Sequence, residues 1–157
     1  MKKTVGGKNM GLKKFYPLRT KGKSEVAQCK DRIQALLRAN AIKKYGTCVL
    51  VKYPEAGECG GLGSKSGKLI LQAEHLNTRQ RNISYGDMRN IVLLCLHHHG
   101  FWKEQHSRLY WELIEKIIGP KRWEWLKKVE ADKKDYNFVL YDWQKIELSL
   151  KQALVDN

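Results

Sequence analysis

The chain has 157 residues, the length of one ordinary domain, and carries 30 Lys and Arg residues against 16 Asp and Glu residues. The net charge of +14 is high for a soluble enzyme with a small substrate and indicates a polyanionic partner. The longest apolar run, residues 91–96, is far below the roughly 18 residues of a membrane span. Glycines at 6 and 7 stand where a signal peptide would be apolar, so we expect a soluble, cytoplasmic protein.

Residues 1–24 are strongly basic. They contain no acid and show no apolar periodicity, which predicts a flexible arm that lies along phosphates; a tail that only aids solubility is the alternative. We expect residues 25–157 to form a single domain with its core motif at 69–106 and a helical part at 107–157. The basic residues of the arm are Lys2, Lys3, Lys8, Lys13, Lys14, Arg19, Lys21 and Lys23.

The elements predicted in chain order include both helices and strands. Apolar residues at helical spacing predict a helix that Ser24 caps and Gly46 ends. A β-like run at 47–53 and a glycine-rich turn at 54–68 precede strands at 69–76 and 91–94. Helices follow from residue 98 onward: one over 108–118 with Ser107 as its cap, one over 121–132, and one from Asp142 through 153. This order predicts an α+β fold with an N-terminal helix and several C-terminal helices.

Trp111, Trp123, Trp125 and Trp143 fall within these later helices. Bulky aromatic residues at helical spacing more often fill a core than stack on nucleic-acid bases, so we interpret them as core residues.

The cysteines and histidines suggest a metal site. Disulfides are uncommon in the expected compartment, and Cys95 and His98 have the spacing of a zinc knuckle. With Cys48 and Cys59, which flank the glycine-rich turn, they would form a closed tetrahedral site for structural zinc. The alternative is reduced cysteines with unrelated roles. We interpret Cys29 as a core thiol and His97 as exposed.

A second set of residues carries chemistry. Glu74 and His75 end one predicted strand, Asn90 precedes the next, and His99 follows Cys95 and His98. This order and spacing resemble the HNH nuclease family over residues 69–106. The phrase LQAEHLNTR and the basic helix before the first cysteine are similar to small phage and prophage HNH proteins. The resemblance implies a ββα-metal finger with an adjacent zinc knuckle.

The resemblance also implies roles. A neutral imidazole suits proton abstraction from water near neutral pH, so His75 would be the general base. Glu74 and His99 would hold a catalytic Mg²⁺ or Mn²⁺ ion, and the amide of Asn90 would tie the loop between the strands and fix His75. Many HNH motifs have another His four residues after the last one. Lys103 stands there in this chain, and we expect it to contact phosphate.

Arg79 and Arg81 lie between the two predicted strands. They are either a solvated charged loop or, as we prefer, contacts to the DNA backbone. The sequence therefore predicts a metal-dependent DNA endonuclease, encoded by a phage or prophage and acting in a bacterial host on double-stranded or branched DNA. A non-catalytic zinc-stapled module that binds nucleic acid, and a metal-dependent RNase with the same site, are the alternatives.

Overall fold

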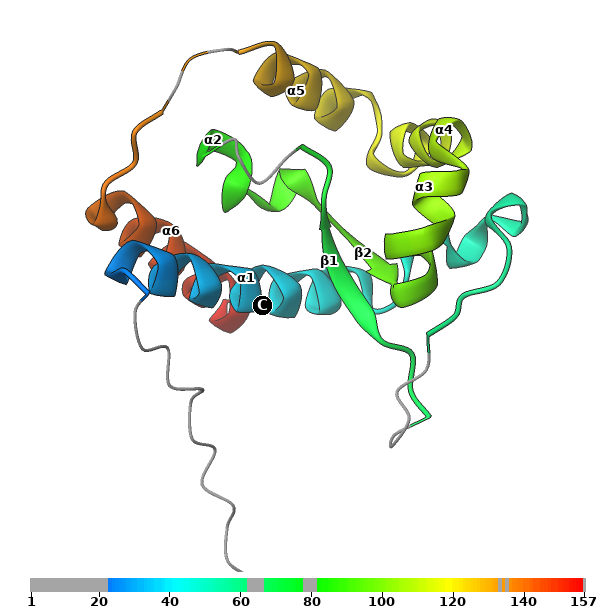
Figure 1. Cartoon of the computed structure of the whole chain (residues 1–157), viewed down its shortest axis with the longest axis horizontal. Coiled ribbons are helices and arrows are strands. Elements are labelled where there is room, and N and C mark those ends of the chain that lie inside the picture. Colours follow the sequence, from blue (N-terminus) through cyan, green and yellow to red (C-terminus); the bar gives the residue numbers. More distant parts are fainter. Residues whose placement is uncertain (1–22, 62–66, 78–81, 133, 135, 157) are drawn as a thin grey trace, which may run out of the picture.

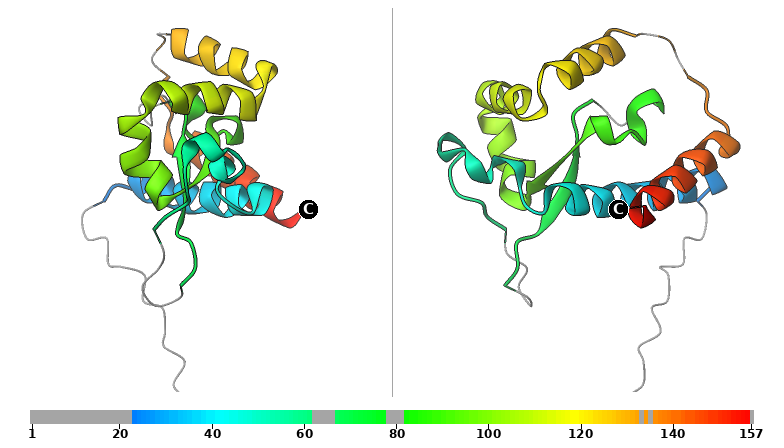
Figure 2. Two further views of the ribbon diagram at one scale, coloured as in Figure 1. Left: turned by 90° about the vertical axis from the view of Figure 1, so that its right-hand side faces the viewer. Right: turned by 180° about the vertical axis from the view of Figure 1, so that it is seen from behind.

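The computed structural model describes residues 23–61, 67–77, 82–132, 134 and 136–156. Most of the predicted basic arm, together with Arg79 and Arg81, lies outside the described residues. Helices surround a two-stranded antiparallel sheet (Figures 1 and 2), so the predicted mixture of helix and sheet is confirmed. None of the described helices is long and apolar enough to cross a membrane.

Helix α1 (Glu25–Tyr45) forms as the sequence predicts. The Ser24 hydroxyl accepts a hydrogen bond from the Ala27 N–H at 3.3 Å, which satisfies one of the free donors of the first turn. At the other end Gly46 adopts φ +72° and donates its N–H to the Ile42 carbonyl. One stripe of the helix is buried, and helix α6 (Leu140–Val155) packs along it (Figure 1). The buried stripe comprises Cys29, Ile33, Leu37, Asn40 and Ala41.

Strands β1 (Leu71–His75) and β2 (Ile91–Cys95) pair with Glu74 opposite Val92 and His75 opposite Ile91. Because side chains alternate along a strand, neighbouring pairs face opposite sides of the sheet. The face that carries Ile91 packs against α1 and α6, and we call this side the helix-pair core. The face that carries Val92 packs against the C-terminal helices, and we call it the metal-side core. All five residues of β2 are buried, which explains why its sequence is apolar throughout.

Side chains from the helices cover the outer edges of this sheet. In an antiparallel pair of strands, opposite residues alternate between hydrogen-bonded and non-hydrogen-bonded pairs. Leu76 is hydrogen-bonded to Asn90, so the backbone groups of Leu71 and Ile91, which belong to non-hydrogen-bonded pairs, point away from the partner strand. The Arg38 Nε atom donates to the Leu71 carbonyl at 2.8 Å. Arg122 and the Tyr45 hydroxyl both donate to the Ile91 carbonyl.

Residues 47–53 are not a strand, so this prediction was wrong. The Val51 N–H bonds the Cys48 carbonyl, and the Tyr53 N–H bonds the Leu50 carbonyl. Cys48 and Leu50 are both fully buried. The residue types of this run, which are typical of strands, therefore predicted the wrong element. The short helices here are η1 (Val49–Lys52) and η2 (Pro54–Ala56).

The C-terminal half is helical, as predicted, but some of its helices begin one or more residues before the predicted start. Ser107 is the first helical residue of α4 and His106 stands in the cap position. Helix α6 begins at Leu140, so Asp142 lies inside its first turn and accepts the Val139 N–H there. Gly119, at φ +78°, separates α4 from α5. The remaining elements are α2 (Asn82–Tyr85), η3 (Met88–Asn90), a π-helical turn η4 (His98–Trp102), α3 (Lys103–Gln105), α4 (Ser107–Ile118) and α5 (Pro120–Ala131).

Candidate metal centre

Three cysteines and one histidine converge on the metal side of the hairpin. Cys48 precedes η1, Cys59 lies in the glycine-rich segment, Cys95 ends β2 and His98 opens η4. Their ligand atoms all lie within 4.8 Å of one another, and this Cys₃His cluster can hold a metal ion such as zinc. The predicted ligand set is thus brought together. Cys29 is buried on the other side of the sheet in the helix-pair core, as predicted. His97, predicted to be exposed, is half-buried and lies outside the cluster.

The distances within the cluster suit tetrahedral coordination. The Nδ1 atom of His98 lies 3.1 Å from the sulfur of Cys95, 3.4 Å from that of Cys48 and 3.8 Å from that of Cys59. Zinc bonds of about 2.3 Å to sulfur and about 2.0 Å to nitrogen would place these atoms about 3.5 Å apart in a tetrahedron. All four positions come from the protein, so the cluster would be a closed, structural site rather than an open catalytic one.

The imidazole of His98 is oriented for this role. Its Nε2 atom lies 3.0 Å from the Ala56 carbonyl, which can only accept, so Nε2 carries the hydrogen and the lone pair of Nδ1 faces the sulfurs. Burial lowers the pKa of His98, which keeps the ring neutral. Burial and the neighbouring sulfurs of Cys48 and Cys95 raise the pKa of Cys59 to about 12. Burial also raises the pKa of Cys48. Without a cation the thiols of Cys48 and Cys59 therefore stay protonated, and a metal ion would bind by displacing protons.

One glycine, Gly61, lets the chain after Cys59 approach the end of β2. Gly61 has φ +87°, and a Cβ atom there would lie 2.5 Å from the Leu96 side chain. The Gly61 carbonyl accepts the Ile70 N–H, and the Ile70 carbonyl accepts the Leu96 N–H. This close approach packs the segment after Cys59 against the end of β2. It explains how the long interval between Cys48 and Cys59 still closes one site.

A second polar group lies on the same face of the hairpin. Glu74 is only 7% exposed, and its two carboxylate oxygens lie 3.1 Å from the Nε2 atom of His99 and 2.7 Å from the Nζ atom of Lys103. Burial alone would raise the pKa of Glu74, but the hydrogen bonds from His99 and Lys103 outweigh it and the pKa is lowered. The carboxylate is therefore ionised near neutral pH. Lys103, expected at phosphate, is instead paired with Glu74 in this structure.

His75 lies on the opposite face. Its Nε2 atom is 3.1 Å from the Tyr85 carbonyl and 3.4 Å from the Gln34 amide nitrogen of α1, and its ring contacts the Tyr85 ring. The carbonyl can only accept, so Nε2 carries the hydrogen and Nδ1 is the basic nitrogen. The described contacts therefore place His75 on the helix-pair side and Glu74 with His99 on the metal side.

Asn90 ties together the chain between the strands. It is fully buried, accepts the Asn77 N–H at 2.6 Å, and donates its amide hydrogens to the carbonyls of Asn77 at 3.3 Å and Ser84 at 3.1 Å. Asn77 follows β1 and Ser84 belongs to α2, just before β2. One side chain thus joins Asn77 to Ser84, the residue directly before Tyr85, whose carbonyl is the hydrogen-bond partner of His75.

Sequence reasoning missed two features of the surroundings. The Tyr85 carbonyl that fixes the His75 ring is a backbone group, which no sequence motif reports. The Tyr110 hydroxyl is buried beside the metal-side core and has no hydrogen-bond partner among the described residues. Burial and the negative charge of Glu74 raise the pKa of Tyr110. In the sequence Tyr110 stands at one of the apolar positions of a predicted helix, and this helical spacing was the only indication that its side chain is buried.

Comparison with protein-family models, with curated proteins and with solved structures found no match.

Proposed function

We propose that this chain is a metal-dependent DNA endonuclease of the HNH type. The observation that carries the proposal is the pairing of Glu74 with His99. Glu74 is the residue before His75 on β1. Two ligands that bind an octahedral ion at right angles, each at about 2.1 Å, lie about 3.0 Å apart. The Glu74 oxygen and the His99 Nε2 atom are 3.1 Å apart, so a Mg²⁺ or Mn²⁺ ion could replace the hydrogen that they share.

The order of the elements supports the same proposal. β1, β2 and the helical segment formed by η4 and α3 follow one another as in a ββα-metal finger. The Cys₃His cluster would anchor the junction between β2 and this helical segment, and His99 directly follows the cluster residue His98. Structural zinc would therefore hold His99 in place for Glu74.

The opposite orientations of Glu74 and His75 fit the chemistry of phosphodiester hydrolysis. In-line displacement puts the attacking water and the departing oxygen on opposite sides of phosphorus. Adjacent residues at a strand end point to opposite sides of the strand. A phosphate that crosses the end of β1 would meet the His75 base on one side and the metal ligands on the other. Hydrolysis of this type would leave 5′-phosphate and 3′-hydroxyl ends.

Three side chains would act in this reaction. His75 would take a proton from the attacking water, while the Tyr85 carbonyl holds Nε2. Its other ring nitrogen, Nδ1, is buried in this structure, so DNA binding would have to open a path for water to it. Glu74 and His99 would hold the ion, which neutralises charge on the phosphate and the leaving oxygen. Lys103 would leave Glu74 when the ion binds and would then contact a phosphate oxygen.

The test is cleavage of supercoiled plasmid by the full-length protein with Mg²⁺, with Mn²⁺ and with neither. We expect nicked or linear product with either ion, and a rate about 10²- to 10⁴-fold lower for His75→Ala. His106→Ala, which removes an exposed histidine, is the control and should cut at the parental rate. Cleavage by His75→Ala at the parental rate would disprove the base assignment. A structured RNA in a parallel reaction tests the RNase alternative.

One observation favours a second function. Both oxygens of Glu74 already have cationic or hydrogen-donating partners in His99 and Lys103, so this group is complete without an ion. A non-catalytic zinc-stapled module that binds nucleic acid would need no more than this. Zinc binding and DNA binding without plasmid cleavage under any of the ion conditions would establish this alternative.

A further inference from the structure

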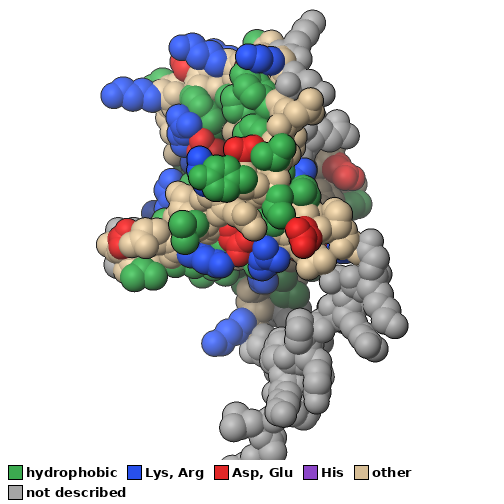
Figure 3. Space-filling view, turned by 90° about the vertical axis from the view of Figure 1, so that its left-hand side faces the viewer, with side chains coloured by type: hydrophobic (Ala, Val, Ile, Leu, Met, Phe, Trp, Pro, Cys, Tyr) green, Lys and Arg blue, Asp and Glu red, His purple; other side chains and the backbone are tan. Residues whose placement is uncertain are grey.

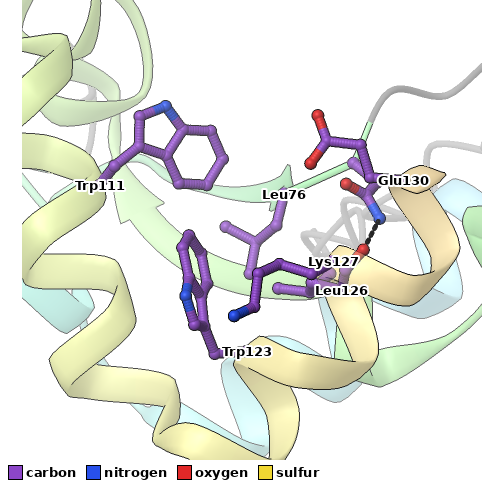
Figure 4. A pocket seen from close by; sticks show the side chains of 7 residues that line it. Leu76, Trp111, Trp123, Leu126, Lys127 and Glu130 are labelled. Carbon is purple, nitrogen blue, oxygen red and sulfur yellow. Dashed lines mark hydrogen bonds between the residues drawn. The ribbon is translucent and has the colours of Figure 1, made fainter.

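A pocket of about 280 Å³ lies between α4, α5 and the residues that follow β1 (Figure 4). Two indole rings lie on one side of the pocket, Leu76 lies at its back, and the Glu130 carboxylate lies across from the indoles (Figure 4). The volume lies just below the range for ligand sites, about 300–1,000 Å³, and so suits one small ring system. The residues that line it include Leu76, Asn77, Trp111, Trp123, Lys127 and Glu130.

Trp111 is the unusual member of this set. It is 39% exposed, whereas Trp143 is 1% exposed, Trp102 is 7% exposed, and Trp125 lies under the Arg89 guanidinium. The prediction that the helical tryptophans all fill the core was therefore wrong for Trp111. An indole with this much free surface at the mouth of a pocket offers a face on which a flat ligand can stack.

The geometry of the two indoles limits how such a ligand can bind. The ring centroids of Trp111 and Trp123 are 6.1 Å apart, and the planes are inclined at 47°. Insertion of a flat ring between them would need parallel planes about 7 Å apart, twice a van der Waals contact. The ligand would therefore stack on one ring, Trp111, with Trp123 and Leu76 as the apolar floor.

The opposite wall is polar. Asn77, Lys127 and Glu130 line it with an amide, an ammonium and a carboxylate, which include hydrogen-bond donors and acceptors. Within the protein, Lys127 pairs with Glu124 and the Asn77 amide nitrogen donates to the Leu126 carbonyl. A nucleobase has the matching combination of a flat face and an edge that carries both donors and acceptors. The net charge of +14 favours the sugar–phosphate chain that would carry such a base.

The pocket also adjoins the proposed reaction site. Leu76 directly follows His75, and the Asn77 backbone donates to the Asn90 side chain at 2.6 Å. The Asn77 side chain donates to the Leu126 carbonyl of α5 (Figure 4), so the same short segment joins the end of β1 to the pocket wall. We propose that this pocket binds one unstacked nucleobase of a DNA strand by stacking on Trp111. The proposal rests on the proposed function in one respect: that function identifies the partner as DNA.

The experiment is binding of a fluorescently labelled single-stranded DNA of ten thymidines to the full-length protein, without divalent ions, measured by anisotropy. Trp111→Ala should weaken binding about 5- to 100-fold, the range found when one base loses its aromatic partner. Trp111→Phe should recover most of the affinity. Tyr141→Ala is the matched control, because Tyr141 is a 62% exposed aromatic residue on α6, far along the chain from the pocket.

Two readouts separate stacking from phosphate binding. An oligonucleotide of the same length made only of abasic sites should bind the parent protein as weakly as thymidines bind Trp111→Ala. The slope of affinity against salt concentration should be the same for parent and variant, because Trp111 carries no charge. Equal binding of abasic and normal DNA, an unchanged affinity for Trp111→Ala, or a changed salt slope would each overturn the proposal. Cleavage is not needed here, so a failed plasmid assay leaves this result interpretable.

Discussion

The carboxylate of Glu74 and the ammonium of Lys103 lie 2.7 Å apart in a nearly buried ion pair on the metal side of the hairpin. Lys103 and His99 are four residues apart, so both reach the same carboxylate from successive turns of the helical segment. An ion that binds Glu74 must compete with Lys103. If Glu74 holds the proposed ion, lysine at this position would set how much free divalent ion the site requires.

This competition gives the first prediction. Lys103→Met removes the ammonium and keeps the aliphatic stem, so Mn²⁺ should bind more tightly than to the parent, by about 10-fold or more. Isothermal titration calorimetry with the zinc-loaded protein measures this affinity. Lys127→Met, a change at a half-exposed lysine of α5, is the control and should leave the affinity unchanged. Weaker Mn²⁺ binding by Lys103→Met would show that Glu74 is not the ligand.

The second prediction concerns the Cys₃His cluster. Purified protein should contain about one equivalent of zinc, and Cys95→Ser should lose both the metal and several kcal/mol of folding free energy, since metal binding and folding are coupled. Elemental analysis and thermal unfolding measure the two effects. Cys29→Ser is the control, because Cys29 is buried outside the cluster and should keep the zinc. Full zinc content in Cys95→Ser would remove this residue from the ligand set.

The third prediction concerns the segment between the strands. Asn90→Asp keeps the acceptor for the Asn77 N–H but turns both donated hydrogen bonds into contacts between a buried carboxylate and carbonyl oxygens. We expect a loss of about 3 kcal/mol in the free energy of unfolding. Urea unfolding followed by circular dichroism measures it. Gln144→Glu, an exposed change of the same chemical kind on α6, should cost less than about 0.5 kcal/mol.

The fourth prediction concerns acid stability. Glu147 of α6 accepts hydrogen bonds from Arg32 and Lys151, and these lower its pKa from 4.5 to about 2. A lowered pKa stabilises the fold above the unfolded value of 4.5, and the contribution is lost as the pH falls towards 2. Both partners are about half exposed, so we expect about 2 kcal/mol rather than the full value of the shift. The parent should exceed Glu147→Gln by this amount at pH 6, and the difference should vanish near pH 2. A difference that does not depend on pH would contradict the assignment.

The distribution of basic side chains bears on how DNA would be held. On the face shown in Figure 3, Lys and Arg side chains occur from top to bottom among acidic and hydrophobic ones, without forming one continuous patch. If DNA binds here as proposed, these side chains would contact phosphates and give little sequence discrimination, since phosphate contacts position DNA without reading bases.

The sequence predicted those parts of the molecule that depend on local signals. The caps at Ser24 and Gly46 and the two strands follow from residue types at fixed spacing. The Cys₃His cluster followed from ligand chemistry, because few other roles explain Cys95 and His98 beside two further cysteines. Residues 47–53 were predicted wrongly because a short run of residue types typical of strands does not exclude a tight helical turn.

The arrangement across the hairpin could not be predicted in the same way. The Lys103 partner of Glu74 and the Tyr85 carbonyl beside His75 depend on how helices far apart in the sequence pack on each strand. The partial exposure of Trp111 likewise depends on the distance between α4 and α5. Periodicity indicates that such a residue is apolar on one side, but it does not indicate whether a neighbour covers it.

The side chains that cap the strand edges have a further consequence. A two-stranded sheet presents two rows of backbone groups to which a foreign strand could add, a common route to aggregation. Arg38, Arg122 and Tyr45 already occupy the outward carbonyls of Leu71 and Ile91. An incoming peptide would have to displace guanidinium and hydroxyl donors before it could extend the sheet, so the hairpin stays at two strands.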